Sequence, residues 1–177
     1  MEKDWRLLLQ KQNQLNKVIE TNQRTKQYGL FLSKRDAELI LEERNHALQE
    51  EQRVEFGESI TLKIINEFCG SDYIDQSNYV TTVVRLQQIF YLYKNEMNDE
   101  ITDDELLHFM NEQFEFICYG DLDYLEGTCL NIFSQAIRAG YRGYRSSEGR
   151  REYAGFDEVK RWDYELYLDC LKELCWR

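Results

Sequence analysis

The chain has 177 residues, of which 14% are aromatic, and a formal net charge of −11 at pH 7. This length suffices for one hydrophobic core, and the aromatic content excludes a disordered or low-complexity chain. The sequence contains no proline, which favours a fold made almost wholly of helices, and its acidity argues against general nucleic-acid binding.

Residues 1–27 are predicted to form a polar outer helix with a narrow inward face. That face recurs at heptad-like spacing through Trp5, Leu8, Leu15, Ile19 and Asn22, and Gln12 interrupts it. A seam of this width indicates a helix laid on a bundle, or one that needs a second chain to cover it. A homodimer is therefore possible but not required. Gly29 is suited to end the helix in the left-handed conformation.

Residues 28–140 are predicted to form the core bundle, with helices over 33–50, 59–69, 78–97, 102–119 and 121–140. The central element is 78–97, because its apolar residues cover nearly all sides for about twenty residues without Gly or Pro. Two capping boxes, Ser33 with Asp36 and Thr102 with Glu105, mark helix starts, and Asp121 is expected to cap the last helix. We interpret Gly127, inside that helix, as a site of close helix packing.

Residues 141–155 are predicted to be a loop rich in Arg, Tyr and Gly, and residues 156–177 a C-terminal helix. The fold class is therefore all-α, a single-domain bundle of about seven helices around the central helix 78–97. The apolar run near the N-terminus is too short for a signal peptide or a membrane span, so we expect a cytoplasmic protein with no membrane contact.

Charge is distributed unevenly along the chain. Residues 98–137 contain ten acidic and no basic side chains, whereas residues 138–161 contain seven basic and four acidic ones. Opposite potentials are usually juxtaposed, so we expect the acidic block to face the basic segment or the N-terminal helix within the fold. The alternative is a polarity that serves to bind a partner.

Four fragments, TKQYGLFLS, QRVEFG, FCGSDYI and IFYLYKNE, together resemble a family of bacterial proteins, mainly from Gram-positive species, catalogued as a domain of unknown function. The resemblance spans roughly residues 18–139. It implies a cytoplasmic bacterial helical protein and assigns no activity, cofactor or catalytic residue.

The two histidines suggest a metal hypothesis, because each completes a Glu-x-x-His motif: Glu43 with His46, and Glu105 with His108. Di-iron four-helix bundles use two such pairs with a further Glu from each of two other helices, for which Glu20, Glu67 and Glu96 are candidates. Against this, the chain is dense in Glu, and Glu105 is also explained as a capping acid. A metal-binding enzyme is therefore the alternative function, and we expect no cofactor.

A second candidate site follows the bundle, where arginines are interleaved with tyrosines. Its proposed partner-binding residues are Arg138, Arg142, Tyr144, Arg145, Arg150 and Arg151. Arginine binds phosphate or carboxylate, and tyrosine stacks on bases, so a nucleotide, single-stranded nucleic acid or acidic peptide would fit. The simpler interpretation is a loop whose arginines pair internally with acids.

The five cysteines contain no Cys-x-x-Cys pair and indicate neither a disulfide framework nor a zinc knuckle. Cys118, Cys129 and Cys170 fall on apolar helical faces and are expected to be core residues. The sequence favours a non-enzymatic binding or scaffolding module for a protein partner, through the N-terminal helix and the Arg/Tyr segment. Nucleic-acid binding is the weaker alternative.

Overall fold

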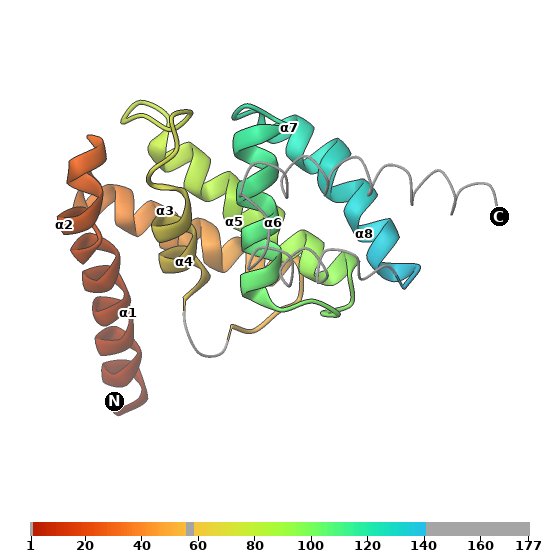
Figure 1. Cartoon of the computed structure of the whole chain (residues 1–177). Helices are drawn as coiled ribbons and strands as arrows, with labels where there is room; N and C mark the ends of the chain where they lie inside the picture. The colour runs from red at the N-terminus through yellow and green to blue at the C-terminus, as the bar shows by residue number, and fades with distance from the viewer. Residues whose placement is uncertain (1, 56–58, 141–177) are drawn as a thin grey trace, which may run out of the picture.

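The computed structural model describes residues 2–55 and 59–140, and this part of the chain is all-α (Figure 1). Its longer helices are α1 (Glu2–Glu20), α3 (Lys34–Glu50), α4 (Ile60–Phe68), α5 (Tyr79–Glu96) and α6 (Asp103–Phe116). A continuous helical stretch follows, made of α7 (Leu122–Tyr124), the π-helical η2 (Leu125–Leu130) and α8 (Asn131–Arg138). Short α2 (Asn22–Thr25) and the 3₁₀ turn η1 (Lys26–Tyr28) connect α1 to α3.

Helix α5 lies at the centre of the bundle, as its sequence predicts. Six apolar residues recur along one side of residues 78–97 at steps of three and four, and all are buried: Tyr79, Val83, Leu86, Phe90, Tyr93 and Met97. Helices α3, α4 and α6 pack against α5, and the buried side chains form one hydrophobic cluster. Two of the buried polar side chains bond main-chain carbonyls: Gln87 donates to that of Ile40, and Lys94 donates to that of Ile101.

The predicted helix starts are confirmed at atomic detail. The hydroxyl oxygens of Ser33 and Thr102 accept hydrogen bonds from the third helical N–H groups, and the acids at those positions bond back to the capping residues. Asp121 accepts from the N–H groups of Asp123 and Tyr124. Gly29 has a φ of +74°, which ends the first helical stretch in the left-handed conformation.

The last helical stretch differs from its prediction. The sequence predicts one regular helix, whereas the π-helical turn η2 adds a residue to the helical repeat. Beyond this turn Phe133, Ala136 and Ile137 are buried, and Ile132 is only partly buried. The hydroxyl of Tyr93 donates to the main-chain carbonyl of Glu126 within this turn. Gly127 is exposed, and a Cβ there would meet nothing within 4 Å, so our interpretation of close packing was wrong.

Helix α3 buries one of its charged residues, Arg44, which is 6% exposed. Its guanidinium lies 3.3 Å from the Oε2 atom of Glu55. The other oxygen of Glu55 accepts from the hydroxyl of Tyr91 at 3.0 Å and from the N–H of Ile60, at the start of α4, at 2.8 Å. This buried network ties the segment after α3 to α4 and α5.

The four fragments that carry the family resemblance meet in pairs. The side-chain amide of Gln76, just after FCGSDYI, bonds both the N–H and the carbonyl of Phe31 in TKQYGLFLS. At the other end of α5, Arg53 of QRVEFG donates to Asn95 of IFYLYKNE at 2.8 Å. These hydrogen bonds connect distant parts of the chain at the two ends of α5.

Candidate functional site

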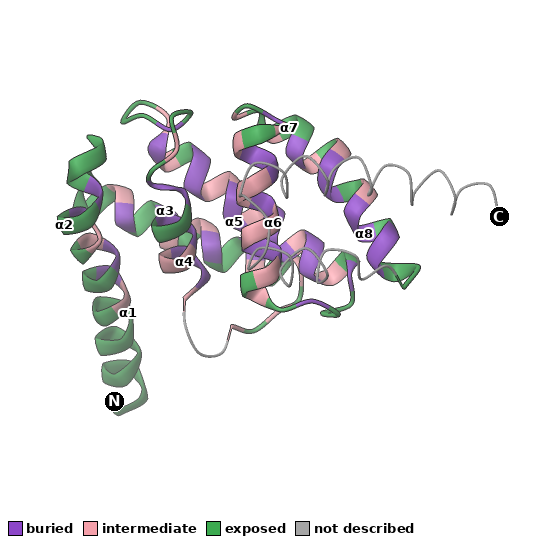
Figure 2. Ribbon diagram, in the orientation of Figure 1, coloured by how far each residue is buried: buried purple, intermediate pink, exposed green. Residues whose placement is uncertain are grey.

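The first half of α1 projects from the bundle with its apolar side chains uncovered (Figures 1 and 2). Every residue from 2 to 13 is exposed, a length of about 18 Å at the helical rise of 1.5 Å per residue. The exposed fractions are 64% for Trp5, 55% for Leu7, 61% for Leu8 and 47% for Leu9. We call residues 2–13 the α1 arm.

The arm carries the same seam that anchors the rest of α1. From Leu15 onward this side of α1 is covered: Leu15 is 7% exposed, the neighbouring Val18 is 1% exposed, and Ile19 is partly buried. This part of α1 packs on α3 and α4. Leu8 and Trp5 continue that face about two and about three turns before Leu15, where both side chains are exposed. Helix α1 is thus laid on the bundle at one end, as one of the two sequence predictions expects, and is uncovered at the other end.

Two grooves flank α1 where the arm meets the body. One, of about 320 Å³, lies between α1 and α3 and has Leu8, Leu15 and Leu41 among its lining residues, with Glu38 and Glu42 beside them. Because it begins at Leu8, this groove continues the uncovered seam onto the body. It gives a partner that follows the arm a place to end.

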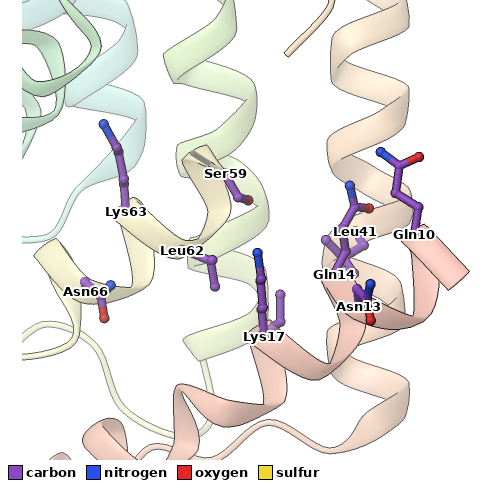
Figure 3. Close-up of a pocket in the computed structure, with 10 residues that line it drawn as sticks. Gln10, Asn13, Gln14, Lys17, Leu41, Ser59, Leu62, Lys63 and Asn66 are labelled. Atoms are coloured by element: carbon purple, nitrogen blue, oxygen red, sulfur yellow. The ribbon is translucent and has the colours of Figure 1, made fainter. Parts of the chain in front are cut away.

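The second groove, of about 790 Å³, lies on the α4 side of α1. Figure 3 shows Asn13 and Lys17 of α1 facing Leu62, Lys63 and Asn66 of α4 across it. Its lining combines amide and amine side chains with the apolar side chains of Val18, Leu41 and Leu62.

The arginine-rich candidate site is described at one residue only. Arg138, in the last turn of α8, lies with its Nη1 atom 3.7 Å from the Oε2 atom of Glu96 on α5. This contact agrees with internal pairing at that position. The other proposed residues, Arg142, Tyr144, Arg145, Arg150 and Arg151, and the predicted helix over 156–177 lie outside the described residues.

The histidines of the two Glu-x-x-His motifs contact different carboxylates. His46 has a 68% exposed side chain with its Nδ1 atom 3.8 Å from Glu43, whereas His108 has its Nε2 atom 3.0 Å from Glu112. The carboxylate of Glu105 bonds the N–H of Thr102 in the capping box. Within residues 2–55 and 59–140, no three His, Cys, Asp or Glu side chains are grouped so that they could hold a metal ion.

The acidic block is paired with cations that the sequence analysis did not assign to it. Asp99 receives two hydrogen bonds from Arg53, at 2.7 and 3.0 Å, which lower the pKa of that carboxyl. Lys94, 5% exposed, lies 2.9 Å from Asp103. Arg85 further along α5 likewise contacts Asp123 and Glu126, and Lys63 of α4 contacts Asp104. The bundle itself thus supplies cations to this block.

Two buried thiols meet at the end of α6. The Sγ atoms of Cys118, in the turn after α6, and Cys129, in η2, lie 3.6 Å apart, and these residues are 7% and 1% exposed. The hydrogen bond between the two sulfurs raises the pKa of Cys118 and lowers that of Cys129. Core packing was predicted for both, but their proximity was not.

Sequence reasoning also missed the buried Arg44, although a signal for it exists. The inward positions of α3 recur at steps of three and four from Ala37 through Ile40 to Ala47, and this period passes through residue 44. An arginine at such a position predicts a buried carboxylate partner, which Glu55 supplies.

Comparisons with known proteins place the chain in a family without assigning a function. No helix of the described part is both long and apolar enough to cross a membrane. No curated protein and no solved structure matches the chain. The model of a family of unknown function, DUF6323, matches residues 17–143, which begin where α1 becomes buried and leave the α1 arm outside the match. The chain therefore belongs to the DUF6323 family.

Proposed function

We propose that this chain is a bacterial, cytoplasmic, non-enzymatic binding module that holds a helix of a protein partner against the α1 arm. The observation that carries the proposal is the uncovered seam of the arm, with Trp5 64% and Leu8 61% exposed. Isolated helices shorter than about 12–15 residues are marginal in water, so a projecting arm of this length gains stability from a partner.

The geometry favours a helix as the bound element. The seam is a narrow stripe at heptad-like spacing, which is the surface that an amphipathic helix covers along its length. The groove between α1 and α3 extends the stripe beyond Leu8 to Leu15 and Leu41. A partner helix that runs along the arm would therefore end against the body of the bundle.

The size of the effect follows from the buried area. Fully burying a large apolar side chain is worth about 1.5–3 kcal/mol, so the double substitution Trp5→Ala and Leu8→Ala would remove roughly 3 kcal/mol or more. Because about 1.4 kcal/mol corresponds to a tenfold change, partner affinity would fall by roughly a hundredfold. Stability of the bundle would change little, since both side chains are exposed.

Site-specific photo-cross-linking in cells tests this proposal. A photoreactive amino acid replaces Trp5, Leu8 or, as a control, Leu39, which is 44% exposed on α3 and lines neither groove. We expect a discrete protein adduct from positions 5 and 8, each weakened when the other of these two positions is alanine, and none from position 39. The adduct mass separates a second copy of this chain from a different protein. Absence of any adduct at positions 5 and 8 would refute the proposal.

A further inference from the structure

The turn between α6 and η2 brings the thiols of Cys118 and Cys129 into contact. A disulfide has an S–S distance of about 2.0 Å, so the 3.6 Å between the sulfurs of Cys118 and Cys129 must shorten by roughly 1.6 Å. The backbone around them is not regular α-helix: Tyr119 and Gly120 have positive φ angles, and Cys129 lies in a π-helical turn. Single π-turns recur at functional sites.

We propose that Cys118 and Cys129 are a redox site, a dithiol that a peroxide converts into a reversible intramolecular disulfide. The site is independent of the partner surface, because it lies in the α6–η2 connection and not on α1. Cytosolic disulfides, where they occur, are usually transient and serve redox sensing.

The chemistry needs only the two thiols and the peroxide. The thiolate of one cysteine attacks a peroxide oxygen, which gives a sulfenic acid and hydroxide, and the hydroxide takes up the proton that the thiol released. The sulfur of the second cysteine then attacks the sulfenic sulfur. The S–S bond forms, and the sulfenic hydroxyl leaves as water with the second thiol's proton. Two thiols and one peroxide molecule thus yield one disulfide and two water molecules when the oxidant is hydrogen peroxide.

The local structure favours this pair over the other described thiol. Cys118 meets solvent at 7% exposure, so a small oxidant approaches the pair from its side. The sulfur of Cys69, by contrast, donates to the main-chain carbonyl of Asn66 and is not paired with a second sulfur in the described part of the chain. Cys69 is therefore an internal control.

Peptide mapping of the full-length, fully reduced protein tests the site. After hydrogen peroxide treatment and alkylation, trypsin releases residues 95–138 as one peptide that contains both cysteines. We expect this peptide to lose two hydrogen atoms in mass, to resist alkylation at both positions, and to recover both thiols on dithiothreitol treatment. Cleavage after Asp121 or Glu126 should give two peptides joined by the disulfide, while Cys69 is alkylated after unfolding.

Two variants and one unfolded control make the result decisive. Cys118→Ser and Cys129→Ser should each abolish the linked peptide, and a sulfenic-acid trap on the remaining cysteine shows which sulfur attacks first. Linkage should be far less selective in urea, where Cys170 and Cys175 compete. The proposal is wrong if both thiols remain alkylatable in the folded protein, if either is linked instead to Cys170 or Cys175, or if the linkage forms equally in urea.

Discussion

Replacing Asn22 with alanine should destabilise the bundle strongly, whereas the same change at Gln76 should not. Each side-chain amide makes two hydrogen bonds to one residue of the connection between α1 and α3. Asn22 bonds the N–H and carbonyl of Leu32, both at 2.8 Å, and Gln76 bonds those of Phe31 at 2.7 and 2.8 Å. The geometry is the same, and burial differs: Leu32 is 1% exposed, whereas Phe31 is 58% exposed.

The difference in burial sets the magnitude. A buried donor or acceptor left unsatisfied costs about 1–3 kcal/mol, so Asn22→Ala, which strands two such groups, should lower the free energy of unfolding by about 2–4 kcal/mol. At Phe31 water replaces the lost bonds, and Gln76→Ala should cost less than about 1 kcal/mol.

Urea unfolding of the full-length chain, followed by circular dichroism, measures both costs. The two variants should have the same dependence on urea as the wild type, so that the midpoints report stability alone. Equal costs for the two substitutions, or a cost below about 1 kcal/mol for Asn22→Ala, would refute the reasoning that burial of the clasp decides its contribution.

Three further predictions use the same assay. Gly120→Ala should destabilise the bundle by about 2–3 kcal/mol, because φ is +83° and the new Cβ would lie 2.6 Å from the Cβ of Tyr73. Gly127→Ala, with open space around it, should be neutral or stabilising by up to about 1 kcal/mol. A larger loss of stability for Gly127→Ala than for Gly120→Ala would contradict this geometry. Asp99→Asn should lower the free energy of unfolding by about 0.5–1 kcal/mol at neutral pH, because Arg53 lowers the pKa of Asp99 below its ordinary 3.8. This difference in stability from the wild type should be constant above about pH 5 and vanish as the pH falls through the lowered pKa. A difference that persists in acid would show that the charge of Asp99 is not its cause. Thr102→Ala should cost about 1 kcal/mol by removing the capping box of α6, and no loss would mean that the cap is not formed in solution.

Local chemistry made much of the bundle predictable from the sequence. Capping boxes depend on side chains three residues apart, so Ser33 and Thr102 could be assigned without knowledge of the rest of the fold. The apolar run of α5 identified the central helix, since a helix that is apolar on most sides has to be buried. The boundaries at Gly29 and Asp121 followed from backbone freedom and from a local hydrogen bond.

The candidate sites were less predictable, because they depend on contacts between distant residues. Heptad spacing in α1 indicated a narrow apolar stripe that another helix could cover. Which residues of that stripe are buried depends on where α3 and α4 pack beside α1. The Glu-x-x-His spacing could not show whether two helices turn those pairs toward each other. Likewise, the acidic block could not be matched with Arg53, Arg85 and Lys94 by position in the chain.

The sequence by itself determined the helices, their caps and the central position of residues 78–97, because these follow from period and short-range hydrogen bonds. Only the tertiary structure decided that the α1 arm is uncovered, that Arg44 is buried against Glu55, and that Cys118 meets Cys129. Each of these features depends on how the helices pack, and the contact of Cys118 with Cys129 also depends on the π-helical turn η2. Packing brings together side chains that are far apart in the sequence, so their distance in space cannot be read from their spacing along the chain.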